Sequence, residues 1–216
     1  MADMDVKELK QKYAAGERDF SIADLRGAEL EGIDLSGAVL HGAILDGANL
    51  IQANLTEAHL GGATLKGANL TEANLSDADL SDAILDGAIL EGAILDRTIL
   101  NQADLKTAVL DRASLSDADL SEADLTKADL TEADLSKADL QAAALDKASL
   151  NDADLSGAKL VGARLVEADL TGADLTVADL QDADLTQAAL DEADLSGAIL
   201  ENTTLEGTVL ETDSTT

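Results

Sequence analysis

The sequence predicts an all-β solenoid, a chain that winds into a rod and turns a corner every five residues. Leu occupies every fifth position from Leu25 to Leu210, 38 times in succession, and Phe20 lies one step earlier in the same register. With each Leu taken as position i, Ala occupies position i−2 in 34 of these 38 repeats. The exceptions are Ile33, Thr98, Thr203 and Thr208. No insertion or deletion interrupts the register, as expected when one structural unit stacks on itself.

The five-residue period excludes a simple helix and a flat strand. On an α-helix, five residues advance the side-chain direction by about 140°, so the Leu side chains would spiral around the axis. On a flat strand, an odd spacing would send successive Leu side chains to opposite faces. Because positions i and i−2 share one side of extended backbone, Leu and Ala are predicted to point inward and positions i−1, i+1 and i+2 outward. Position i+2 holds 14 of the 16 glycines, which suits a corner that sometimes needs φ > 0.

Composition narrows the classes of function. The formal net charge is −30, so a basic protein partner is expected and direct binding to nucleic acid or to an anionic membrane is not. Hydrophobic residues make up 46% of the chain and are regularly placed, which argues against disorder. The chain has no Cys, which excludes disulfide and thiolate chemistry. No run approaches the roughly 18 apolar residues of a membrane span, and residues 1–5 lack the features of a signal peptide, so a cytoplasmic location is predicted.

The repeat A-(D/N)-L-x-x, seen at residues 53–57 (ANLTE) and 123–127 (ADLTK), resembles the pentapeptide-repeat family. The resemblance covers residues 20–210, and residues 13–20 are similar to the start of several cyanobacterial members. It implies a right-handed quadrilateral parallel β-helix, in which four pentapeptides close one coil. On that basis the 39 repeats make just under ten coils. At the ~4.8 Å spacing of hydrogen-bonded strands, the rod would be roughly 47 Å long.

Three segments are expected along the chain. Residues 1–19 are predicted to form a capping helix and a linker, and residues 20–210 the β-helix. Residues 211–216 form a polar tail that is too short to be a capping helix. Because a solenoid must cover its open strand edges, either this tail folds across the last coil or two rods meet end to end as a homodimer.

The N-terminal helix is predicted at residues 5–15. Asp5 followed by Glu8 resembles a capping box, and Gly16 is a suitable stop. Three apolar residues recur at helical spacing and would lie over the first coil: Val6, Leu9 and Tyr13.

The outward positions show no catalytic constellation, and the sequence predicts a non-enzymatic protein without a cofactor. The only histidines, His41 and His59, fall near one face about one coil apart without an evident third ligand, so no metal site is predicted. Ser residues without a partnered His lack an activating base. Exposed carboxylates lack the apolar pocket that makes a general acid.

An acidic column is the first candidate site. Residues 20 apart stack on one face of a square coil, which places in one column Asp134, Asp154, Asp174 and Asp194. Like charges ~5 Å apart repel, so such a column lowers stability. Three interpretations remain open: a surface that keeps the rod soluble, weak binding of divalent cations, or mimicry of DNA.

Mimicry of DNA is suggested by charge density. Residues 20–210 carry 37 acidic and 10 basic side chains, a net charge of −27. Spread over roughly 47 Å, this is about one charge per 1.7 Å, close to the density of the duplex. Some members of the family look like DNA and act on type II topoisomerases. Those members commonly carry a Phe-rich core, a C-terminal dimerisation element or projecting loops, which this sequence lacks.

An apolar belt is the second candidate site. Four consecutive i−1 positions hold Ile, and in a square coil they would ring the rod once: Ile84, Ile89, Ile94 and Ile99. Either they dock a partner protein, or they are isolated apolar residues without a role. The resulting prediction is a structural or protein-interaction rod with an unidentified protein partner. The alternative is a DNA-mimicking modulator of gyrase.

Overall fold

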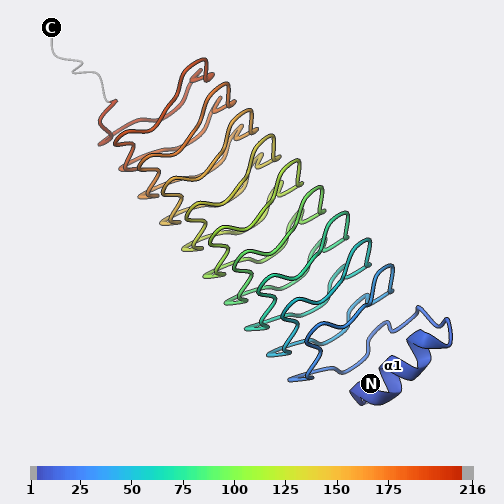
Figure 1. The fold of residues 1–216 in the computed structure, drawn as a ribbon. Coiled ribbons are helices and arrows are strands. Elements are labelled where there is room, and N and C mark those ends of the chain that lie inside the picture. Colours follow the sequence, from blue (N-terminus) through green and yellow to red (C-terminus); the bar gives the residue numbers. More distant parts are fainter. Residues whose placement is uncertain (1–3, 211–216) are drawn as a thin grey trace, which may run out of the picture.

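The computed structural model describes residues 4–210 as a rod of stacked coils, with a single helix at the N-terminal end (Figure 1). Helix α1 spans Val6–Ala14. The strands are reduced to one bridging residue per side of each coil. Parallel bridges join residues 20 apart, from Asp19 with Val39 to Asp184 with Thr204. A repeat of 20 residues means that four pentapeptides close each coil, so the rod has four sides.

The core is the stack of Leu and Ala that the sequence predicts. From Leu30 to Leu185 the Leu side chains are at most 1% exposed, and the Ala side chains facing the lumen from Ala38 to Ala183 are equally buried. Thr98 takes the place of one Ala in the fully buried interior. Its hydroxyl donates to the carbonyl oxygen of Leu75 at 2.8 Å, which satisfies the only polar group that the substitution adds.

The corners are more uniform than the sequence indicates. Every i+2 residue from Ile22 to Gly207 has φ > 0, whether or not it is Gly. A positive φ at the second residue of a corner, but not at the first, is the pattern of a type II turn. Lys127 (φ 61°) and the β-branched Val177 (φ 52°) adopt this conformation although it favours Gly. Hydrogen bonds to the neighbouring coils therefore determine the corner geometry, and side-chain preference is secondary.

Helix α1 closes the N-terminal end of the rod. Asp5 caps it by accepting a hydrogen bond from the N–H of Glu8 at 2.7 Å, while the Glu8 carboxylate pairs with Lys12 at 3.1 Å. Leu9 is completely buried and belongs to the same apolar cluster as the Leu stack. The Tyr13 hydroxyl is 2.8 Å from the carbonyl oxygen of Ser36, to which it donates. The helix thus covers the first coil, as predicted.

The C-terminal coil is more open. Leu200 and Leu210 are each 37% exposed, in contrast to the buried Leu residues inside the rod. Outward-facing Ile199 and Val209 add exposed apolar surface at the same end. The predicted tail at 211–216 lies outside the described residues.

Candidate interaction surface

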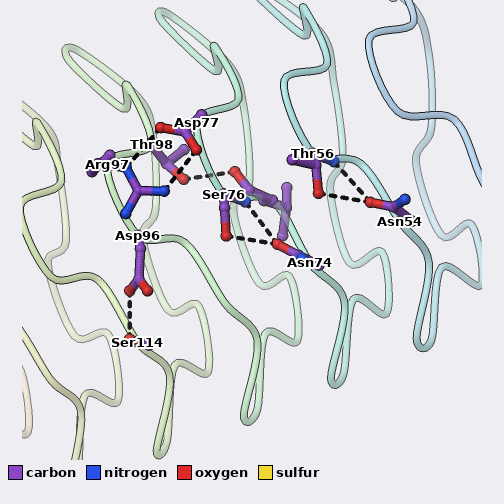
Figure 2. A network of polar contacts seen from close by, with 10 residues as sticks. Asn54, Thr56, Asn74, Ser76, Asp77, Asp96, Arg97, Thr98 and Ser114 are labelled. Carbon is purple, nitrogen blue, oxygen red and sulfur yellow. Dashed lines mark hydrogen bonds and ion pairs between the residues drawn. The ribbon is translucent and has the colours of Figure 1, made fainter.

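The backbone of each pentapeptide explains why Asp and Asn recur at position i−1. In residues 53–57, three N–H groups donate to adjacent coils and that of the Ala closes the preceding corner, all at 2.7–3.0 Å. Only the N–H at position i+1, Thr56, has no backbone acceptor. It donates instead to Oδ1 of Asn54 at 3.2 Å. Figure 2 shows this contact and the equivalent one between Ser76 and Asn74.

This cap is general along the rod. Every Asp or Asn at position i−1, from Asp19 to Asp194, accepts a hydrogen bond from the N–H two residues later, at 2.8–3.4 Å. Where that residue is Ser or Thr, its hydroxyl often donates to the same oxygen, as Ser76 does to Asn74 at 2.7 Å. Asp and Asn side chains have the right length for this local contact.

We expect the substitution Asn74→Ala to lower the free energy of unfolding by about 1 kcal/mol, because it leaves the N–H and hydroxyl of Ser76 without their shared acceptor. Asn74→Asp is the matched control, since it keeps the acceptor oxygen. Urea unfolding of both variants measures the difference. Equal loss of stability in the two variants would contradict the cap.

The four Asp residues of the acidic column lie in successive coils on one side of the rod. Parallel bridges join Asp134 to Asp154, Asp154 to Asp174, and Asp174 to Asp194. In each of these residues Oδ1 accepts the N–H two residues later, at 2.8–2.9 Å. The column therefore has a structural role that the sequence interpretation missed. The local caps offset part of the repulsion between its charges.

The caps also lower the pKa of the Asp carboxyl groups described next, Asp184 and Asp169. Hydrogen bonds from the hydroxyl and then the N–H of Thr186 hold the pKa of Asp184 below its usual value. For Asp169, the Thr171 hydroxyl is the main cause of the lowered pKa; partial burial opposes it, and the Thr171 N–H adds to it. A pKa lowered by folding means that the folded state binds the proton more weakly than the unfolded state.

We therefore expect these caps to stabilise the fold fully above the unfolded-state pKa of about 3.9, and to lose that contribution as the pH falls through the lowered folded-state values. The double variant Asp169→Asn plus Asp184→Asn keeps both acceptors but cannot titrate. Thermal unfolding followed by circular dichroism between neutral and acidic pH should show less acid destabilisation in this variant than in the wild type. A parallel loss in both proteins would refute the prediction.

The isoleucine belt, residues Ile84, Ile89, Ile94 and Ile99, lies at four consecutive bridging positions, one on each side of the rod. Ile89, Ile94 and Ile99 are 36–41% exposed. Because Ile cannot accept a hydrogen bond, the belt leaves four consecutive corners without the cap. Over residues 4–210, no protein acceptor faces the N–H groups of Asp86, Glu91, Asp96 and Asn101.

The two histidines lie together but form no metal centre. The rings of His41 and His59 are 5.9 Å apart between centroids and are tilted by 36°. Among the residues that the structure describes, no three His, Asp or Glu side chains converge as they would around a metal ion. Over the same residues, no helix combines the length and the apolar character that crossing a membrane requires.

Four-sided parallel coils around a Leu and Ala core define a right-handed quadrilateral parallel β-helix. The family model described as Pentapeptide repeats matches the chain repeatedly, over residues 19–56, 33–72, 48–87, 73–112, 113–152, 148–187 and 178–211. The chain belongs to the pentapeptide-repeat family.

Solved structures similar to this chain include HetL and QnrB1. HetL, a pentapeptide repeat protein involved in heterocyst differentiation regulation from the cyanobacterium Nostoc sp. strain PCC 7120, is 40% identical, covers 95% of this chain and 97% of its own, and has a TM-score of 0.56. QnrB1, a plasmid-mediated fluoroquinolone resistance protein, is 20% identical over 86% of this chain and 90% of its own, with a TM-score of 0.64. At that identity the second likeness shows the fold alone. No curated protein matches the chain.

Proposed function

We propose that the protein is a rod for protein interaction, and that the isoleucine belt is its docking surface. The observation that supports this proposal is the replacement of Asp or Asn by Ile at four consecutive capping positions, with Ile89, Ile94 and Ile99 left 36–41% exposed. Each replacement gives up a hydrogen bond worth about 1 kcal/mol, because Ile has no oxygen to accept the N–H two residues later. Departures from a local rule of this kind are expected at functional sites.

The charge around the belt favours a basic partner. Three of the four Ile residues are followed two positions later by an acidic residue, namely Asp86, Glu91 and Asp96. With a formal net charge of −30, the chain as a whole attracts basic proteins and repels acidic ones. The proposal keeps the cytoplasmic location that the sequence predicts.

The test is the double variant Ile89→Asn plus Ile94→Asn. Asn removes the exposed apolar side chains, adds no charge and restores the cap at two corners. We expect the variant to be more stable than the wild type by about 1–2 kcal/mol and yet to lose the partner in affinity capture from native-host extract. Retained capture by a correctly folded variant would end the docking proposal.

A second candidate function is mimicry of DNA toward a type II topoisomerase. Support comes from the uninterrupted run of bridges that stacks Asp134, Asp154, Asp174 and Asp194. In a gyrase supercoiling assay, inhibition by the wild type should be lost when Asp134, Asp154 and Asp174 are changed to Asn. The matched control changes Asp119, Asp139 and Asp179 to Asn, with the same change of charge on another side of the rod. Inhibition lost equally in both triple variants, or absent from the wild type, counts against a specific acidic column.

We also propose that two rods pair end to end through their C-terminal coils. Leu200 and Leu210, which belong to the core register, are each 37% exposed there, and a second copy would cover them. We expect light scattering at high concentration to give twice the monomer mass, and the mass to fall to that of one chain in Leu200→Glu. A wild-type mass of one chain at high concentration would refute pairing.

A further inference from the structure

A notch of about 210 Å³ opens at one corner of the rod, lined by Thr71, Glu72, Glu91, Gly92 and Arg112. This corner separates two members of the isoleucine belt. Ile89 lies three residues before Gly92 and Ile94 lies two residues after it. The notch is therefore part of the same surface as the belt.

The notch lies where Gly92 has no side chain, whereas the two adjacent coils carry long side chains at the same corner. Along this corner the i+2 residues of successive coils are Gln52, Glu72, Gly92 and Arg112, so long side chains flank Gly92 on both sides. A Cβ atom built at Gly92 would have as its nearest neighbour Cγ of Glu72, at 3.9 Å. The backbone does not require Gly here, because Glu72 (φ 56°) and Arg112 (φ 55°) adopt the same conformation as Gly92 (φ 61°).

The charge of the notch is negative and incompletely balanced. Arg112 is held by two carboxylates, those of Glu91 and Asp111, at 2.5 and 2.6 Å. Glu72 accepts a hydrogen bond from the Gln52 amide at 2.7 Å, and no Lys or Arg among residues 4–210 pairs with it. The guanidinium of Arg112 thus balances two carboxylates, and the charge of Glu72 remains without a cation among residues 4–210.

We propose that this notch receives a Lys or Arg side chain of the partner protein, and that the apolar residues on either side of that Lys or Arg rest on Ile89 and Ile94. Glu72 supplies the carboxylate for the incoming cation, and Gly92 supplies the space. This inference rests on the proposed docking function and specifies its partner as a segment with a basic residue between apolar ones. A basic residue between apolar ones matches both the charge and the exposed apolar surface of this corner.

The probe for this proposal is the peptide N-acetyl-Leu-Lys-Leu-amide, titrated into the ¹⁵N-labelled protein and followed by NMR. We expect saturable shifts of the amide signals of Glu72, Glu91 and Gly92, which weaken as salt is raised. Gly92→Gln should reduce the affinity by roughly tenfold or more, because the new side chain fills the notch. Glu72→Gln, which keeps the shape and removes the charge, should also reduce it.

The matched control is Gly32→Gln. Gly32 lies at the same corner three coils away, has the same φ of 61°, and has open space around its Cβ direction. It should leave peptide binding unchanged, and N-acetyl-Leu-Glu-Leu-amide should not bind the wild type. Equal binding by the wild type and Gly92→Gln, or shifts as large along the acidic column as at the notch, would overturn the proposal.

The two sets of variants distinguish failure of the notch proposal from failure of the proposal that the belt is a docking surface. If Ile89→Asn plus Ile94→Asn abolishes capture of the partner while Gly92→Gln retains it, the belt stands and the notch is overturned. If both variants retain capture, the docking function itself is refuted.

Discussion

Ala133→Phe should lower the free energy of unfolding by ~1–3 kcal/mol or more, because the lumen has no room for an aromatic ring. Ala133 is 1% exposed and lies in a layer already filled by buried Leu side chains. The added ring must either displace a Leu from its rotamer or force adjacent coils apart. Separation of the coils would weaken the hydrogen bonds that the N–H groups of Leu130 and Leu135 donate to the next coil, both at 2.7 Å.

The matched control is Ile94→Phe, which adds an aromatic ring at an outward position that is 41% exposed. It should change stability by less than about 1 kcal/mol, since the ring enters solvent rather than the lumen. Thermal unfolding followed by circular dichroism measures both variants. If Ala133→Phe unfolds at the wild-type temperature, position i−2 does not face the interior as the core assignment requires.

The inward positions could be predicted from the sequence because they follow from geometry alone. A period of five with Leu at i and Ala at i−2 allows only one side of an extended segment to face inward. The number of sides could not be obtained in this way, since any number of corners is compatible with a period of five. The resemblance to a family supplied that number, and the bridge between Asp19 and Val39, 20 residues apart, confirms it.

Two local features could not be predicted because they depend on hydrogen bonds between coils. Glycine at some i+2 positions indicates occasional positive φ, yet Lys127 and Val177 adopt it as well, since each corner must present the same N–H to the adjacent coil. From the sequence alone, the Asp residues at i−1 can be interpreted only through their charge. The physical origin of the Asp and Asn preference is the unpaired N–H at i+1, which becomes evident only when the acceptors of the other four N–H groups are known.

The hydrogen bonds of the caps also give a physical reason to regard the isoleucine belt as functional, which the sequence pattern alone does not give. An exposed Ile on a strand is ordinary when nothing is lost by placing it there. Ile89 and Ile94 occupy positions where Asn or Asp would cap the following corner, so each substitution to Ile carries a defined loss of stability. If the variant Ile89→Asn plus Ile94→Asn is more stable than the wild type and no longer binds the partner protein, the belt lowers stability in order to bind.

Leu9→Asp is expected to release helix α1 and to lower the free energy of unfolding by about 3 kcal/mol or more, since truncation of a buried Leu alone costs 2–5 kcal/mol. Leu9 is completely buried against the first coil, where a carboxylate would have no partner. Release of the helix would break the hydrogen bond from the Tyr13 hydroxyl to Ser36. Because Tyr13 is the single Tyr and the chain has no Trp, its intrinsic fluorescence reports the helix directly.

Gln11→Asp is the matched control, because it makes the same change of charge at an exposed position of α1. We expect it to leave Tyr13 fluorescence unchanged and to alter stability by less than about 1 kcal/mol. In Leu9→Asp the uncovered edge of the first coil should also pair with other molecules, so light scattering should show association that the control lacks. Wild-type fluorescence together with wild-type stability in Leu9→Asp would mean that α1 lies beside the rod without closing it.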